Sequence, residues 1–413
     1  MKNVMDTLKE RGYIKQTVYG EDLYELLGKE SVAFYIGFDP TADSLHVGHF
    51  LALMAMSHMQ KAGHKPIVLV GGGTGKIGDP SGRTDMRKML TDGDIIYNCN
   101  RFKEQMSKFF SFVGDNAAIM VNNADWLDNL KYIDFIRDIG SLFSVNKMLT
   151  AECFKSRMER GLSFLEFNYM LMQSYDFLYL YEKYNCKLEC GGDDQWSNIL
   201  AGADLIRRKL QQPAFAMTFT LLTTSQGTKM GKTAKGAVWL DRKKTTPYEF
   251  FQYWRNINDE DVEKCFKLLT FVELDEIQRI CPIADKPETY TGTTYEKKIN
   301  EAKERLAYEI TLIVHSKEDA DTALSQAKAA FLLNNDAEMP LQKLSSHLTL
   351  IVDILVDLKL VKSKGEAKRL IEGGGIKINA RSISDINAEL LDSEETEFVL
   401  HKGKKVHIKV ING

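Results

Sequence analysis

Short apolar runs recur through the first 225 residues, and each is closed by a glycine, aspartate or asparagine. Five have the length of buried strands, at 32–38, 65–72, 117–122, 186–192 and 215–223. Helical patterns separate them, for example at 47–62, 94–112 and 197–211. Buried strands that alternate with helices predict an α/β fold with a doubly wound, Rossmann-like parallel sheet. Ligands of such sheets bind at the carboxyl ends of the strands, so a functional site is expected there.

The pattern divides the rest of the chain into further parts. A helical insertion is expected from about 125 to 182, which leaves 1–224 as the sheet domain. A loop and connection follow, then a helical domain, a linker around "LNNDAEMPLQ" and a small α+β domain. Their expected bounds are 225–246, 247–333, 334–346 and 347–413.

Composition narrows the classes of protein. Of the 413 residues, 44% are hydrophobic and 27% charged, and the net charge of −3 argues against a protein that coats DNA generally. The amino terminus lacks the apolar core of a signal or transit peptide, and no run of eighteen apolar residues predicts a membrane span. The six cysteines complete no zinc set, so we expect buried reduced thiols and a cytoplasmic location.

Two histidines stand together in "TADSLHVGHF" (41–50), although the chain has only 8. The preceding strand ends at Asp39, and a helix is expected to begin near Val47. His46 and His49 would then lie at the amino end of that helix, where backbone N–H groups favour an anion and the imidazoles can donate to phosphate oxygens. Gly48 would let a flat ring approach the backbone. The alternative is a pair of capping or core histidines.

Two other strand ends carry glycines and charges. In "VGGGTGKIGDPSGRTDMRK" (70–88) the spacing does not fit a Walker phosphate loop, but Asp79 would lie at the crevice floor, with Arg83 and Arg87 nearby. In "GGDDQWSN" (191–198) Gly192 would admit a ligand to the backbone, and Asp194 could accept from ribose hydroxyls. The alternatives are a plain loop and an acidic helix cap.

Polar residues also interrupt an apolar helix. Tyr169, Gln173 and Asp176 share one face of a helix that looks buried nearly all round. Buried polar groups need partners, which either the protein or a polar ligand must supply. In "GTKMGKT" (227–233) Lys229 and Lys232 follow the last strand, and the alternative there is a solvated basic loop.

These stretches together resemble the class I aminoacyl-tRNA synthetases, and within them the bacterial-type tyrosyl-tRNA synthetases. "HVGH" is similar to the HIGH signature and "KMGKT" to the KMSKS signature. The resemblance rests on five stretches in order over the first 235 residues: "YIGFDPTADSLHVGH", "IGDPSG", "NYMLMQSYDF", "GGDDQWSN" and "KMGKT".

The resemblance implies that ATP and tyrosine give tyrosyl-AMP and pyrophosphate, and that the tyrosyl group then passes to tRNA(Tyr). It places Tyr35 and Asp176 at the phenolic hydroxyl, Tyr169, Gln173 and Asp79 at the ammonium group, and Gln195 near the carboxylate. It places Gly37, Asp39 and Gly48 at the adenylate, with Gly192 and Asp194 at the ribose. It places Thr41, His46, His49, Lys229, Lys232 and Thr233 around the phosphates, with Arg83 and Arg87 over pyrophosphate.

The implied chemistry suits these residue types. Charge rises on phosphate oxygens, which fixed donors and lysines stabilise, and Mg²⁺ is expected with ATP but without a protein-bound metal site. Three departures stand out. Gly231 replaces the serine of KMSKS, which would loosen the loop. Ile36 stands where some family members have a residue that can hydrogen-bond the ribose, so one sugar contact is expected to be missing. Glu189 and Asp193 make the pocket more acidic, and the sequence leaves their protonation open.

The tail carries a separate charge pattern. Residues 359–381 hold seven Lys or Arg against two Asp or Glu, whereas 382–400 hold six acids and no base. Ser363 and Glu366 have the spacing of a capping box, and the helix they begin should end at 373–375. The segment resembles an S4-type RNA-binding module, whose tRNA-binding residues would be Lys364, Lys368, Arg369 and Lys377. A solvated basic face is the alternative.

The resemblance further implies a homodimer through the 125–160 insertion, with tyrosine, ATP and tRNA(Tyr) as partners and no membrane. Two other functions compete with this interpretation. A different nucleotidyl transferase could use the same histidine turn, although the buried Tyr169–Gln173–Asp176 face speaks against it. A synthetase-like RNA-binding protein without catalysis would not need His46 and Lys232 intact.

Overall fold

The computed structural model describes residues 3–77, 91–158, 161–233, 236–282, 292–329, 340–379, 381–391, 396–403 and 406–412. The chain forms two compact units, residues 1–316 and 317–413, each with its own sheet. In the described part of the chain, no helix is both long enough and apolar enough to cross a membrane.

The first unit is built on a six-stranded sheet in the order β1-β6-β5-β2-β3-β4. Its strands are β1 (Ile14–Val18), β2 (Ala33–Phe38), β3 (Lys65–Val70), β4 (Ile119–Asn122), β5 (Cys186–Gly192) and β6 (Phe215–Phe219). The five strands expected from the apolar runs are all present and mutually parallel, which confirms the α/β doubly wound fold. The sixth, β1, pairs antiparallel with β6 at the edge. Its half-polar sequence "IKQTV" does not form an apolar run, so the sequence pattern gave no sign of it.

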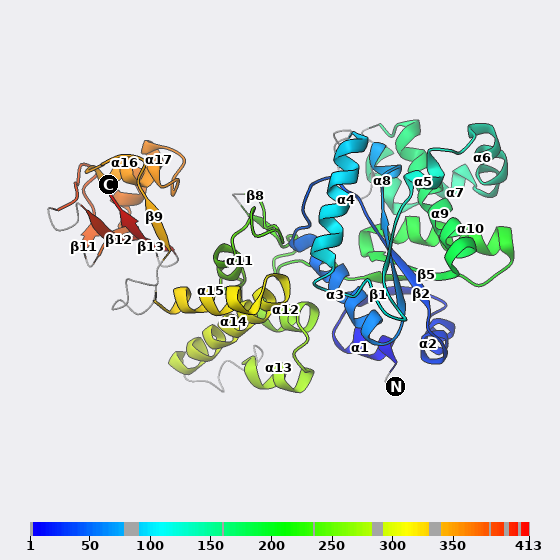
Figure 1. Cartoon of the computed structure of the whole chain (residues 1–413), viewed down its shortest axis with the longest axis horizontal. Helices are drawn as coiled ribbons and strands as arrows, with labels where there is room; N and C mark the ends of the chain where they lie inside the picture. The colour runs from blue at the N-terminus through cyan, green and yellow to red at the C-terminus, as the bar shows by residue number, and fades with distance from the viewer. Residues whose placement is uncertain are drawn as a thin grey trace. The chain divides into compact units, whose positions relative to one another are not determined.

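Helices cover both faces of this sheet (Figure 1). They are α1 (Val4–Glu10), α2 (Gly20–Lys29), α3 (Val47–Lys61), α4 (Asp92–Met106), α9 (Phe164–Tyr184) and α10 (Trp196–Leu210). Helix α3 packs on β3, whereas α9 and α10 pack on β5 and β6. The chain therefore leaves β2 toward one edge of the sheet and returns through β5 toward the other. The point where this direction changes lies between β2 and β5, where a doubly wound sheet opens a crevice.

The expected insertion is a series of short helices between β4 and α9. They are α5 (Ala124–Leu127), α6 (Tyr132–Asp138), η2 (Gly140–Leu142), α7 (Val145–Leu149) and α8 (Glu152–Met158). Met148 and Phe154 pack against Met170 and Leu171 of α9, which anchors the insertion to the sheet domain.

A hairpin and a helical region complete the first unit. They comprise β7 (Lys232–Thr233), β8 (Gly236–Ala237), α11 (Pro247–Arg255), η4 (Asp259–Asp261), α12 (Val262–Leu269), α13 (Leu274–Ile280) and α14 (Gly292–Val314). Buried Arg11 joins this region to the sheet domain, because its guanidinium donates to the carbonyls of Lys267, Thr270 and Val272 at 2.7–3.1 Å. These carbonyls lie at the end of α12, where backbone acceptors have no partner within the helix.

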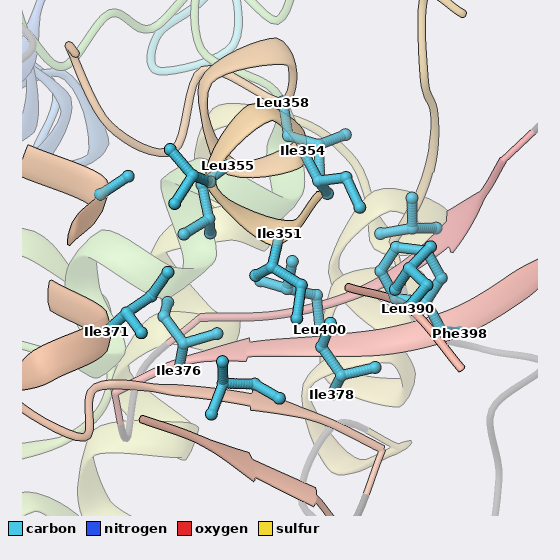
Figure 2. Packing of buried hydrophobic residues seen from close by; sticks show 14 of the residues in the cluster. Ile351, Ile354, Leu355, Leu358, Ile371, Ile376, Ile378, Leu390, Phe398 and Leu400 are labelled. Atoms are coloured by element: carbon cyan, nitrogen blue, oxygen red, sulfur yellow. The ribbon is translucent and has the colours of Figure 1, made fainter. Parts of the chain in front are cut away.

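The second unit holds a five-stranded sheet in the order β11-β10-β12-β13-β9. Its elements are α15 (Lys317–Ala329), β9 (Leu341–Lys343), α16 (Ile351–Asp357), α17 (Lys364–Glu372), β10 (Ile376–Ile378), β11 (Arg381–Ile383), β12 (Glu397–Lys402) and β13 (Val406–Ile411). Ile351, Leu355 and Ile371 of the helices pack over Ile376 and Leu400 of the strands (Figure 2).

Two details of this unit differ from the sequence-based expectation. Strand β9 lies inside the expected 334–346 linker but pairs in parallel with β13. All three of its residues are exposed, so no apolar pattern announced it. Ser363 caps α17 through the amide of Glu366, as expected, but the Glu366 carboxylate accepts from the amide of Lys362 instead of completing a capping box.

The cysteines are free thiols at all six positions, each of which lies within the described residues. Four are buried, as expected, whereas Cys99 and Cys153 are half-buried.

Candidate functional site

A cavity of about 390 Å³ opens at the carboxyl ends of β2 and β5, between α3, α9 and residues 229–232. It lies at the switch point of the sheet, where a ligand crevice is expected. The predicted site residues that line it are Tyr35, Gly37, Asp39, Thr41, His46, Gly48, His49, Tyr169, Gln173, Asp176, Gly192, Asp194, Gln195, Lys229 and Lys232.

The two histidines cap α3 and also face this cavity. His46 Nδ1 accepts from the amide of Gly48 at 3.0 Å, and His49 Nδ1 accepts from the amide of His46 at 3.2 Å. Their rings stack with centroids 4.0 Å apart. Because Nδ1 accepts in both rings, the proton of each neutral imidazole is on Nε2. Capping and phosphate binding are thus compatible roles of the same residues.

The glycines around these histidines make close packing possible. A Cβ on Gly48 would lie 2.7 Å from Cε1 of the His46 ring, so only glycine leaves room for that ring. Gly231 has φ +84°, and a Cβ there would lie 2.7 Å from Cβ of Val47. The Gly231 amide donates to Tyr253 Oη at 2.7 Å, and its carbonyl accepts from Val238 at 2.8 Å. Glycine at this position therefore fits a docked segment, in contrast to the loosening expected from the sequence.

Asp176 lies at the buried end of the cavity. Its carboxylate accepts from Asn123 Nδ2 at 2.9 Å and from Trp126 Nε1 at 2.7 Å. Burial raises the pKa of Asp176 to about 7, while the two donors oppose that rise by stabilising the charged form. The protein thus supplies part of the hydrogen bonding that the sequence showed to be necessary.

Tyr35 of β2 lies near Asp176 of α9, close enough for the Asp176 carboxylate to contribute to the raised pKa of Tyr35. It is the third residue of β2. Its hydroxyl is buried, and burial together with the carboxylate of Glu189 raises the pKa of Tyr35 well above its usual value. Glu189 itself lines the cavity, accepts from Gln173 Nε2 at 3.0 Å, and has a pKa that burial raises to about 8.

Two residues of η3 (Asp193–Gln195) also line the cavity, Asp194 and Gln195. Asp194 pairs with Lys229, with Nζ 3.1 Å from Oδ2. Gln195 Oε1 accepts from Asn198 Nδ2 at 3.2 Å. This hydrogen bond fixes the orientation of the amide, so that its NH₂ group is the end left to donate to a ligand. Asp193 accepts from Gln16 and Thr218 and does not line the cavity, so of the two extra acids only Glu189 makes the pocket more acidic.

Some predicted residues are not part of this cluster. Thr233 is exposed and its hydroxyl donates to the carbonyl of Gly236, outside the cavity lining. Asp79, Arg83 and Arg87 lie outside the described residues. Lys364, Lys368, Arg369 and Lys377 belong to the second unit, where all four are exposed and Lys364 pairs with Asp353 at 2.8 Å. In the described ranges, no three His, Cys, Asp or Glu side chains are grouped as metal ligands.

Three residues of the site were missed by sequence reasoning. Asn123 and Trp126 follow β4 directly, and the polar residues at that strand end could have indicated that the site extends there. Trp239 lies edge-on to the His46 ring with centroids 5.9 Å apart, and its backbone bridges to that of His46. No local pattern placed Trp239 there.

Comparison with known proteins gives matches along the whole chain. A family model described as tRNA synthetases class I (W and Y) matches residues 28–332. A second, described as the tyrosine–tRNA ligase SYY-like C-terminal domain, matches residues 333–410. The chain is 57% identical to a tyrosine–tRNA ligase of Clostridium botulinum (strain Hall) and 56% identical to one of Clostridium perfringens (strain ATCC 13124), with 100% of both chains covered in each case.

Solved structures agree on the fold. A C-terminally truncated mitochondrial tyrosyl-tRNA synthetase of Aspergillus nidulans is 28% identical with a TM-score of 0.68, covering 79% of this chain and 94% of that one. A tyrosyl-tRNA synthetase of Archaeoglobus fulgidus complexed with L-tyrosine is 16% identical with a TM-score of 0.57, covering 78% of this chain and 99% of that one.

Proposed function

Because this chain belongs to the class I tRNA synthetases and acts as a tyrosine–tRNA ligase, we propose that the cavity of the first unit activates tyrosine with the residues that line it. The substrates are tyrosine, ATP and tRNA. The observation that carries the assignment of residues is the lining of one cavity by hydrogen-bonding groups from β2, α3, α9, β5 and η3 together with residues 229–232.

The tyrosine side chain would enter between β2 and α9. Its phenol would donate to the Asp176 carboxylate and meet the hydroxyl of Tyr35 at the same point. Its ammonium group would be held by Tyr169 and Gln173, with Asp79 as the third partner. The amide NH₂ of Gln195 suits the carboxylate, because the hydrogen bond from Asn198 to Oε1 fixes which end of the amide donates.

ATP would occupy the other half of the cavity. Gly37, Asp39 and Gly48 would border the adenylate, and Gly192 and Asp194 the ribose. Asp194 is paired with Lys229 here, so a ribose that binds Asp194 would release this lysine toward the phosphates. Mg²⁺ would enter with the triphosphate, whose oxygens are its usual ligands.

In the reaction, a tyrosine carboxylate oxygen attacks the α-phosphorus, the bond to the bridging oxygen breaks, and pyrophosphate leaves with that electron pair. No general base is required, since the nucleophile is already an anion. Nε2–H groups of His46 and His49, with Thr41, Lys229 and Lys232, would stabilise the charge that rises on the phosphate oxygens. Thr233, Arg83 and Arg87 complete the proposed set. Removing one such donor typically costs about 3 kcal/mol, or ~10²-fold in rate.

The remaining parts would serve the second step, transfer of the tyrosyl group to tRNA(Tyr). Residues 347–413 would bind the tRNA backbone in the manner of an S4 module, through exposed Lys364, Lys368, Arg369 and Lys377. The helical domain 247–333 would face the anticodon side of the tRNA, and 225–246 would carry the KMSKS-type loop.

We further propose a homodimer formed through the 125–160 insertion. Its helices and the start of α9 expose large apolar side chains, a feature of protein interfaces. These are Tyr132, Ile133, Val145, Met158, Phe164 and Leu165. A cytoplasmic location would suit the six free thiols, since reducing compartments keep cysteines unpaired.

The test of the residue assignment is ATP–pyrophosphate exchange with tyrosine and phenylalanine measured side by side. Phenylalanine would leave buried Asp176 and Tyr35 unpaired, and this enzyme family is itself the known case of such rejection, at about 10⁵-fold. Tyr35→Phe should weaken the discrimination between the two amino acids. Unchanged discrimination in this variant would show that the phenol is recognised elsewhere.

A further inference from the structure

A buried carboxylate lies in the sheet at the point where the tyrosine pocket opens. Glu189 is 1% exposed and sits on β5 between Leu188 and Cys190. Its Cα is paired in register with that of Tyr35 on β2, so the two side chains belong to neighbouring strands at the switch point. An ionised group at such a position is costly unless it has partners, so its presence requires an explanation.

One carboxylate oxygen determines the orientation of Gln173. Gln173 Nε2 donates to Glu189 Oε1 at 3.0 Å. The NH₂ end of the Gln173 amide therefore faces Glu189, whose Oε1 accepts both when the carboxyl is ionised and when Oε2 carries the proton. The amide oxygen then turns to the cavity, where a substrate ammonium group needs an acceptor.

The Glu189 carboxyl also interacts with the Tyr35 hydroxyl. This hydrogen-bonding interaction raises the pKa of Tyr35 and opposes the rise in the pKa of Glu189. Glu189 Oε2 and Tyr35 Oη are both buried, and no other side chain in the described residues offers either atom a partner. Gly202 of α10 leaves room for Glu189 Oε2, since a Cβ there would lie 2.9 Å from it. Two buried polar groups at the cavity that have only each other as partner are groups whose hydrogen bonds a ligand can reorganise.

We propose that Glu189 is a positioning residue for tyrosine, which fixes the Gln173 amide with its oxygen toward the ammonium group and sets the direction of the Tyr35 hydrogen bond to the phenol. Ionised Glu189 attracts the Tyr35 proton, so that Tyr35 presents an acceptor to the phenol. Protonated Glu189 can donate to Tyr35, which then presents its own proton. This inference rests on the proposed roles of Gln173 and Tyr35.

The groups around Glu189 make the direction of the Tyr35 hydrogen bond sensitive to pH. Burial raises the pKa of Glu189 to about 8, and the neighbouring Asp176 carboxylate adds to the rise. The titratable groups that interact electrostatically with Glu189 are Tyr35 from β2, Asp176 from α9, and Cys186 and Cys190 from β5 itself. From α10, Gly202 contributes no charge.

The experiment compares Glu189→Gln and Glu189→Met in the full-length chain by pyrophosphate exchange from pH 6 to 9.5. Glutamine can still accept from Gln173 through its oxygen, whereas methionine cannot. We expect KM for tyrosine to rise ~10-fold in Glu189→Met and ~3-fold or less in Glu189→Gln, with KM for ATP unchanged, because a lost buried hydrogen bond has this size. The difference between wild-type and Glu189→Gln profiles of KM for tyrosine should follow a single titration near pH 8.

Two controls separate the possible causes. Glu166→Gln changes another buried carboxylate of the first unit, which caps α9 at Ser163 and does not line the cavity, and it should leave KM for tyrosine within twofold of wild type. Gln173→Ala should raise KM for tyrosine by itself, and adding Glu189→Met to it should raise KM little further.

The outcomes separate the role of Glu189 from that of Gln173. If Gln173→Ala raises KM but Glu189→Met does not, or if Glu189→Gln keeps the wild-type pH profile, the role of Glu189 is refuted. If Gln173→Ala has no effect on KM, the proposed function of Gln173 fails, and the inference fails with it. Should Glu189→Met not fold, the pH profile of Glu189→Gln decides alone.

Discussion

Replacing Trp126 by Phe should shift the pH range over which the protein binds tyrosine. The indole Nε1 donates to Asp176 Oδ1 at 2.7 Å, and its ring stacks on Tyr179 with centroids 4.3 Å apart. Phenylalanine preserves the stacking and removes only the donor. A hydrogen bond to a charged group contributes about 1.5–3 kcal/mol, so its loss should raise the pKa of Asp176 by about 1 to 2. The direction is upward because the donor stabilises the charged form.

The consequence for binding follows from the pKa of about 7 that Asp176 has in the intact pocket. At pH 7.5 about three quarters of Asp176 is ionised, and a pKa of about 8 to 9 would reduce this to about a quarter or less. If the phenol donates to the ionised carboxylate, KM for tyrosine should rise about 3- to 20-fold at pH 7.5. The rise should shrink toward pH 9.5, where Asp176 ionises again.

The assay is pyrophosphate exchange, with KM for tyrosine measured from pH 6.5 to 9.5. Trp254→Phe is the matched control, since Trp254 is fully buried and its Nε1 makes no hydrogen bond among the described residues. It should lower stability without moving the pH profile. A Trp126→Phe profile that coincides with wild type, or a rise in KM that is equal at all pH values, would refute the link between this donor and the ionisation of Asp176.

Three more outcomes follow from the site and the tail. His46→Ala or Lys232→Ala should slow adenylate formation ~10²-fold in stopped-flow measurements while changing tyrosine binding little, because both groups meet charge that develops in the transition state. A loss of tyrosine affinity equal to the loss of rate would contradict this. Deleting residues 340–413 should leave pyrophosphate exchange intact and sharply weaken tRNA charging, whereas loss of both would make the tail structural. Gly231→Ser should slow adenylate formation about 5- to 30-fold, because serine in a left-handed conformation costs about 1–2 kcal/mol and its Cβ would clash with Val47. A wild-type rate would show that this segment adopts another conformation during the reaction.

Predictions from the sequence succeeded where a property depends on residues close together in the chain. The apolar runs identified all five parallel strands because strands covered on both faces are rich in apolar residues, although β5 also contains Lys187 and Glu189. The turn around His46 and His49 was found in the same way, from a strand end followed directly by a helix start. Once two strand ends are known, the topology of a doubly wound sheet brings them to one edge, so the position of the cavity could be predicted. The resemblance to the class I synthetases supplied the remaining site residues, such as Tyr35 and Gln195.

The sequence could not show which partner each buried polar group takes. Asp176 meets Asn123 and Trp126, which are 53 and 50 residues away, and the need for a partner was evident while its identity was not. Glu189 was seen only as an unexplained acid, since its contact with Gln173 depends on the packing of α9 against β5. The exposed strand β9 lacked any apolar signal, because its pairing with β13 uses backbone groups that every residue carries.

The sequence by itself therefore determined the strand–helix order, the position of the cavity and most of the polar side chains that line it. Only the tertiary structure decided how those side chains are held. Gly231 is an example. Only glycine suits this position, because its backbone has φ +84° and a side chain there would clash with Val47, which is 184 residues away in the chain. Local periodicity follows from backbone geometry and can be read along a chain, whereas close contacts between distant residues depend on how whole elements pack.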